Sequence, residues 1–189
     1  MIRAIGLTVL LMALTGPAMA HSGHGESGFL HPFTGVDHVL AAVGVGVWAF
    51  LLASRSRALA SLVPASFLIM TAAGAVAGFG GIKLPLVEAA IVTSVFVIGG
   101  LIVGGVRLPL ALAMAIVGAF AVFHGYAHAM EAPASTSVSY ILGLMAATAV
   151  LEGVGMLLGS LMRRAVGEVG LRALGGLVLA GGTLVLMTN

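Results

Sequence analysis

The sequence predicts an all-α polytopic membrane protein with six transmembrane helices after a cleavable signal peptide, and three observations favour this class. Of the 189 residues, 60% are hydrophobic and only 7% are charged, whereas soluble domains carry roughly 25% charged residues. The apolar residues form runs about as long as a bilayer is thick, separated by short polar stretches. The few basic residues gather in alternate separators, as they do in membrane proteins of fixed orientation.

Residues 1–20 are expected to be a signal peptide. They combine a positive start at Arg3, a compact apolar run and the small-residue cleavage pattern Ala18-Met19-Ala20. The apolar run is too short to cross a bilayer, although an uncleaved first helix is the alternative. Cleavage would leave residues 21–30 as a periplasmic arm, in which His21, with its free α-amino group, and His24 are expected to form an accessory metal-capture site. The alternative for the arm is a flexible polar terminus with incidental histidines.

Residues 31–189 are predicted to form one six-helix transmembrane domain. The apolar runs are separated by stretches that contain arginine, proline or glycine, which mark membrane boundaries and helix ends. One separator contains Arg163 and Arg164, and we expect it to be a loop. No internal repeat is recognisable along the sequence. The expected spans are residues 36–53, 62–80, 86–105, 109–130, 138–161 and 171–188.

The basic residues predict the orientation of these spans. With the mature amino terminus outside, the inner loops and adjoining helix ends contain six arginines, and the outer loops contain only Lys83. Cytoplasmic loops are enriched in basic residues, so we expect an inner-membrane protein with both mature termini in the periplasm. The basic residues are thereby explained as signals that orient the protein in the lipid bilayer, and no nucleic acid partner is expected. The six arginines are Arg55, Arg57, Arg107, Arg163, Arg164 and Arg172.

The fourth span carries a polar stripe near its outer end. His124 and His128 are four residues apart, so their rings share one face of a helix, and Glu131 continues that face. Gly125 leaves room beside His124 for the backbone of a neighbouring helix. Ionisable groups are costly in a bilayer, so they normally face the bundle interior and mark a pathway.

The start of the first span carries a second polar group at the same predicted depth. Asp37 and His38 are adjacent, and His31 precedes His38 by seven residues, about 10 Å along a continuous helix. His31 can therefore join the others only if the chain bends around Pro32 and Gly35. All six histidines of the chain are predicted to lie on this outer side.

These residue types predict a site for a divalent transition metal. Cysteine is absent, whereas imidazole and carboxylate groups suit nickel, cobalt and zinc. Asp37 or Glu131 could also hold the second nitrogen of an imidazole and fix its tautomer. Glu152, near the middle of the fifth span, is predicted to lie deeper in the bilayer than the histidines. It is expected to be the next metal-binding residue on the inward path. The alternative is that Glu152 is a neutral, hydrogen-bonded carboxyl group.

Two motifs resemble the signatures of the HupE/UreJ family of nickel and cobalt permeases. Residues 31–38 resemble H-P-x-x-G-x-D-H, and residues 123–131 resemble F-H-G-x-A-H-G-x-E. The resemblance extends to the number of spans and the topology. Ala129 departs from the usual glycine, and Glu152 stands where family members often carry histidine, so metal preference is not carried over. The resemblance implies metal binding by His31, Asp37, His38, His124, His128 and Glu131.

The predicted function is a permease, not an enzyme, that takes Ni²⁺ or Co²⁺ from the periplasm into the cytoplasm. The ion is the substrate, and no permanently bound cofactor is expected. No phosphate-binding loop of the G-x-x-x-x-G-K-[ST] type is present, so transport would be facilitated, proton-coupled or driven by the membrane potential. One alternative is a membrane-embedded zinc-dependent hydrolase, although no H-E-x-x-H motif occurs. Another is a metal-sensing or scaffolding protein without transport.

Overall fold

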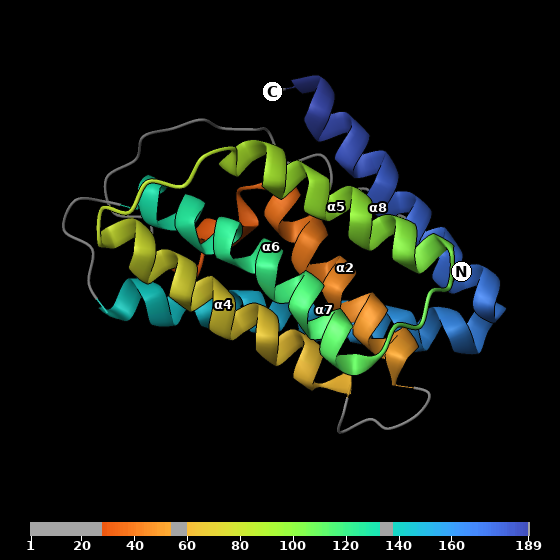
Figure 1. The fold of residues 1–189 in the computed structure, drawn as a ribbon. Helices are drawn as coiled ribbons and strands as arrows, with labels where there is room; N and C mark the ends of the chain where they lie inside the picture. Colours follow the sequence, from red (N-terminus) through yellow and green to blue (C-terminus); the bar gives the residue numbers. More distant parts are fainter. Residues whose placement is uncertain (1–27, 54–59, 133–137, 189) are drawn as a thin grey trace.

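The computed structural model describes residues 28–53, 60–132 and 138–188. Within these ranges the chain forms a short 3-10 turn and six long helices, without a β-strand, and it reverses direction at each connection (Figure 1). The predicted signal peptide, most of the predicted arm, and the connection with Arg55 and Arg57 lie outside the described residues. The elements are η1 (His31–Phe33), α2 (Val36–Leu52), α4 (Leu62–Phe79), α5 (Val87–Val103), α6 (Leu110–Glu131), α7 (Val138–Val166) and α8 (Glu168–Thr188).

The six helices lie at the sequence positions of the six predicted apolar segments, with one clear difference. Helix α7 continues through Arg163 and Arg164 to Val166, so the expectation of a loop at these arginines is wrong. Arginine is a good helix former, so these two residues do not end the helix. The chain turns instead at Gly167, whose φ of +71° is a conformation that glycine adopts without steric cost.

Four of the described helices have the length of membrane spans, and the surface of the bundle is apolar. Helices α4, α6, α7 and α8 are long and apolar enough to cross a bilayer, and α2 and α5 are apolar helices of 17 residues each. Large apolar side chains point outward: Ile69 is 65% exposed and Leu142 is 64% exposed. Polar side chains such as Thr71, Ser94 and Glu152 are buried instead. This distribution fits a protein whose outer surface contacts lipid.

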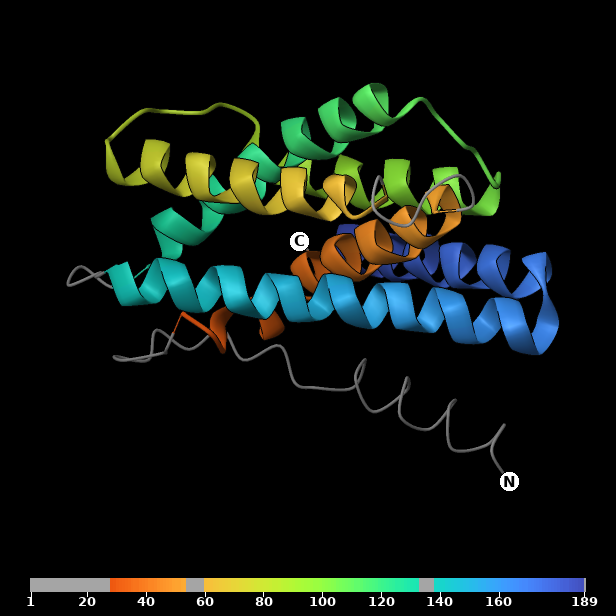
Figure 2. The ribbon, with the colours of Figure 1, turned by 90° about the horizontal axis from the view of Figure 1, so that it is seen from below.

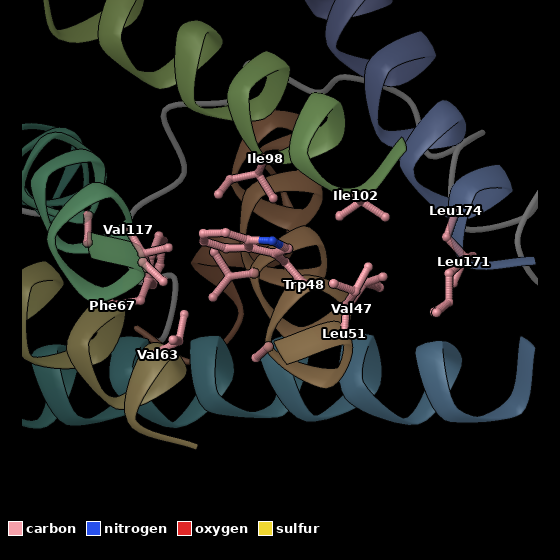
Figure 3. Close-up of a cluster of buried hydrophobic side chains, with 14 residues drawn as sticks. Val47, Trp48, Leu51, Val63, Phe67, Ile98, Ile102, Val117, Leu171 and Leu174 are labelled. Atoms are coloured by element: carbon pink, nitrogen blue, oxygen red, sulfur yellow. The ribbon is translucent and has the colours of Figure 1, made fainter. Parts of the chain in front are cut away.

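Helix α2 lies at the centre of the bundle. It packs along α7 and also contacts α4, α5 and α8, whereas α4 packs along α6 and α5 along α8 (Figures 1 and 2). Trp48 of α2 is fully buried, and its indole N–H donates to the Val106 carbonyl at 2.9 Å. Around the indole, Ile98 and Ile102 of α5 and Phe67 of α4 complete an apolar cluster (Figure 3). This cluster fills the bundle toward the end of α2.

Helices α4 and α6 cross in direct backbone contact, and two glycines allow it. A side chain on Gly125 would overlap the carbonyl oxygen of Thr71, and a side chain on Gly74 would overlap the carbonyl oxygen of Val122. The arrangement is reciprocal. Thr71, which Gly125 faces, lies three positions before Gly74, and Val122, which Gly74 faces, lies three positions before Gly125. Small residues at such crossings let membrane helices approach closely. The space predicted beside Gly125 is filled by the backbone of α4.

The crossing of α2 and α7 repeats this arrangement. Gly46 faces the carbonyl oxygen of Glu152, and Gly155 faces the carbonyl oxygen of Val43, again three residues before the partner glycine. The same glycine-to-carbonyl arrangement therefore brings two pairs of helices, α4 with α6 and α2 with α7, into direct backbone contact.

Two ion pairs join connections at the end of the bundle where α6 begins. Arg107, between α5 and α6, lies 3.6 Å from Glu168, and Arg163 near the end of α7 lies 3.4 Å from the same carboxylate. These pairs are half-exposed and each contributes at most about 1 kcal/mol. Their positions bear on the topology. They place two of the predicted inner connections together, at the end of the bundle opposite the one where α2 begins and α6 ends.

Candidate metal centre

The structure brings the histidines of the first and fourth helices together. The ring centroid of His38 lies 4.9 Å from that of His124 and 4.2 Å from that of His128. All three side chains are buried, with 9%, 2% and 3% of their surface exposed. These rings therefore join the beginning of α2 to the last turns of α6.

His31 joins the group because the chain bends before α2. The turn η1 contains Pro32, and Gly35 has an extended backbone, so His31 does not lie on a continuation of α2. Its ring centroid is 5.1 Å from that of His128, and its Nε2 atom is 3.0 Å from Oε2 of Glu131. His31, His128 and Glu131 each offer a donor atom within 4.8 Å of the others, a spacing that could hold a metal ion.

The Asp37 carboxylate fixes the tautomer of His38. Its Oδ1 atom accepts the backbone N–H of His38 at 2.9 Å and lies 2.9 Å from the ring Nδ1. A carboxylate only accepts, so Nδ1 carries the hydrogen and Nε2 carries the lone pair. Nε2 is buried and has no hydrogen-bond partner among the described residues. Of the two roles that the sequence left open for Asp37, its contacts match that of orienting the imidazole.

The hydroxyl of Ser94, in α5, fixes the tautomer of His124. The Ser94 hydroxyl donates to the Ile91 carbonyl at 2.6 Å and lies 2.9 Å from Nε2 of His124. A hydroxyl has one hydrogen, so its oxygen accepts from Nε2 and the lone pair of His124 falls on Nδ1. Ser94 could not be identified from the sequence, because an isolated serine in an apolar helix usually bonds only its own backbone.

A small cavity lies among these rings, with room for about one water-sized particle. Four buried atoms of its lining residues have no partner among the described residues: His38 Nε2, His124 Nδ1, His128 Nδ1 and Thr71 Oγ1. Buried polar atoms nearly always have a hydrogen-bond partner, so these atoms indicate that the cavity can bind a polar molecule or an ion. The lining residues are Pro32, His38, Ala42, Phe67, Thr71, His124, His128, Thr148 and Leu151.

The other predicted residues lie around this cavity or beyond it. Glu152 is 2% exposed and lies one turn of α7 beyond Thr148, a lining residue, but does not itself line the cavity. Its Oε1 atom has no partner among the described residues. The methyl group of Ala129 packs against Gly78 of α4. His21 and His24 lie outside the described residues.

Comparisons with known proteins agree with the two motifs. The model of the family described as "HupE / UreJ protein" matches residues 9–185. One relative, Protein HupE of Rhizobium leguminosarum bv. viciae, is 39% identical over 188 residues, which cover 96% of this chain and 97% of that protein. No solved structure matches the chain. Because the family match and this relative both extend over nearly the whole sequence, the chain belongs to the HupE/UreJ family.

Proposed function

We propose that this multi-pass membrane protein is a permease that takes nickel or cobalt ions from the periplasm into the cytoplasm. One observation carries the proposal: three buried imidazoles line one small cavity inside an apolar helical bundle, and each has a nitrogen atom without a partner in the described part of the chain. Neutral imidazole is a good ligand for both metals. Membership in the HupE/UreJ family supports the same function.

In this proposal His128 passes the ion between two groups of ligands. The outer group is His31, His128 and Glu131, whose carboxylate is 54% exposed and accessible to a hydrated ion. The inner group is His38, His124 and His128 around the buried cavity. His128 contacts rings of both groups, with centroids 5.1 Å from His31 and 4.2 Å from His38. An ion can therefore exchange ligands one at a time and need not lose all of them at once.

Inward passage requires a change of conformation. The cluster around Trp48 closes the bundle beyond the histidines, and Glu152 is the buried oxygen ligand that we place next on the path. The membrane potential favours entry of a cation by about 2.3 kcal/mol per charge per 100 mV. The proposal includes six spans, a cleaved signal peptide and arginine-rich inner connections.

Accumulation of labelled nickel and cobalt by cells that express the protein tests this function. We expect metal-dependent accumulation above that of cells carrying an empty vector, and no hydrolytic activity of the purified protein with zinc. Accumulation equal to that of the vector control, at verified expression in the inner membrane, would contradict the permease. Zinc-dependent hydrolysis under those conditions would favour the enzyme instead.

Removing the Ser94 hydroxyl should weaken metal binding without removing a ligand. In Ser94→Ala, Nε2 of His124 loses its acceptor, so the lone pair is no longer held on the cavity side. Loss of such an outer partner typically lowers metal affinity by about 10- to 100-fold. The measurement is the apparent KM for cobalt uptake, with Ser94→Thr as the variant that keeps the hydroxyl. Equal apparent KM values in Ser94→Ala and the wild type would show that Ser94 does not orient His124.

The amino-terminal arm is proposed to concentrate metal at the outer group. Deleting residues 21–26 behind an intact signal peptide removes His21 and His24. Because the arm would act by raising the local concentration of metal, uptake should fall at low metal concentration and recover at high concentration. Uptake curves of the deletion and the full chain decide the point. Unchanged uptake at all concentrations would leave the arm without a role, and loss at all concentrations would place it on the path.

A further inference from the structure

We propose that the hydroxyl oxygen of Thr71 is a fourth ligand of the transported ion in the inner group. This inference rests on the proposed function. Thr71 belongs to α4, a helix that carries neither of the two motifs. The inner site would then be built by three helices, with three imidazole nitrogens from α2 and α6 and one neutral oxygen from α4. Three observations support this role.

The first observation is that the Thr71 hydroxyl is not used by its own helix. Buried hydroxyls in this bundle donate to a carbonyl of the preceding turn: Ser66 at 2.7 Å, Ser94 at 2.6 Å and Thr148 at 2.9 Å. That is the usual bond of serine and threonine inside a helix. Thr71 is 1% exposed, yet its Oγ1 atom has no partner among the described residues, and the residue lines the histidine cavity.

The second observation is that the backbone of Thr71 is fixed beside His124. The absence of a side chain at Gly125, the residue after His124, lets the Thr71 carbonyl contact the backbone of α6. The reciprocal contact at Gly74 holds α4 on the other side of the crossing. The hydroxyl is therefore presented to the cavity by a rigid crossing of two helices, which is the condition for a preorganised ligand.

The third observation is the relation between Thr71 and Glu152. Each residue lies at a close helix crossing, where its backbone carbonyl faces a glycine: Gly125 for Thr71 and Gly46 for Glu152. Each side chain is buried and has an oxygen atom without a partner among the described residues. Each crossing thus has a buried side-chain oxygen beside it, which belongs to a cavity-lining residue in Thr71 and lies farther along α7 in Glu152.

A neutral hydroxyl suits an ion that must leave again. It replaces one water of hydration without adding a charge, so the ion is stabilised but not trapped. Transport requires binding strong enough for entry and weak enough for release. Three nitrogens and one oxygen also complete a four-ligand set, the number that catalytic zinc sites reach with three protein ligands and one water. Thr71 would occupy the place of that water.

The test compares Thr71→Val, which removes the hydroxyl and keeps the shape, with Thr71→Ser, which keeps the hydroxyl. Thr93→Val is the matched control, because Thr93 lies outside the cavity and its hydroxyl bonds the Ala89 carbonyl of its own helix. We expect Thr71→Val to raise the apparent KM for cobalt uptake roughly tenfold, a typical cost of weakening a metal site. Thr71→Ser should bring the apparent KM back toward the wild-type value. The visible absorption of Co²⁺ bound to the purified protein should change in Thr71→Val and remain unchanged in Thr93→Val.

His38→Ala in the same experiment separates this inference from the proposed function. Loss of uptake in His38→Ala, together with an unchanged KM and Co²⁺ spectrum in Thr71→Val, would overturn the role of Thr71 and leave the permease standing. Equal increases of KM in Thr71→Val and Thr71→Ser would also overturn it, because packing would then explain the effect. Normal uptake in His38→Ala would overturn the proposed function itself.

Discussion

Cells that carry His38→Ala are expected to accumulate neither nickel nor cobalt, although the variant protein reaches the membrane in normal amounts. The ring of His38 contacts those of both His124 and His128, so its removal leaves the inner group with two imidazoles from a single helix. Insertion depends on the apolar spans, which this change does not alter. His128→Ala should have the same effect, because His128 belongs to the outer and the inner groups.

Uptake of labelled metal, normalised to the amount of membrane-inserted protein, measures this effect. Thr93→Val is a suitable control, because Thr93 is exposed on α5 and its hydroxyl bonds only the Ala89 carbonyl. The control should transport like the wild type. Normal accumulation in both histidine variants would exclude a permease that works through this cavity.

Gly125→Ala is expected to have the largest effect on stability of any single methyl group added to the bundle. The new carbon would overlap the carbonyl oxygen of Thr71, so α4 and α6 would have to separate. Overpacking of this kind costs about 1–3 kcal/mol, and more where backbone must move. For a chain of this size, each kcal/mol lowers the melting temperature by roughly 2–4 °C. Gly46→Ala, at the equivalent crossing, should behave alike.

Thermal unfolding of the purified variants in one detergent checks this prediction. Gly153→Ala and Gly100→Ala are the matched controls, because a side chain at either position meets nothing within 4 Å. Alanine favours a helix over glycine by about 1 kcal/mol, so both controls should melt at or above the wild-type temperature. A Gly125→Ala protein that melts with the controls would show that the crossing is not as close as described.

The positions of the helices were predictable because lipid imposes a simple rule. Each span must be apolar over the thickness of the bilayer, and separators such as the segment with Lys83 interrupt that pattern. The prediction failed at Arg163 and Arg164, where charge was taken to end the helix. A charged residue leaves the bilayer without leaving the helix, and the glycine at position 167 makes the turn.

The candidate site was predictable where it lies within one helix, and less so where it depends on packing. Helical spacing places His124 and His128 on one face, and the stretch with Pro32 and Gly35 indicated the bend that brings in His31. Ser94 and Thr71 come from helices without a motif. The role of Ser94 depends on how α5 packs beside His124. That of Thr71 depends on which of the 28 glycines make crossings, and sequence alone does not distinguish those glycines from the others.

The repeated glycine crossing was not predictable from the sequence for a related reason. What repeats is the register of glycines against carbonyl oxygens, as at Gly46 and Gly125, and not the side chains around them. Backbone contacts constrain only a few small residues, so the other residues around the two crossings can differ.

The most direct test of the central claim is metal influx into vesicles that contain only the purified protein. A fluorescent indicator sealed inside would report Ni²⁺ or Co²⁺ entry under an inside-negative potential, for the wild type and His38→Ala. We predict influx that saturates with metal concentration in the wild type and is absent in His38→Ala. Wild-type protein that binds Co²⁺ but passes none of it, with correct folding verified, would contradict the permease and indicate a metal-sensing or scaffolding protein.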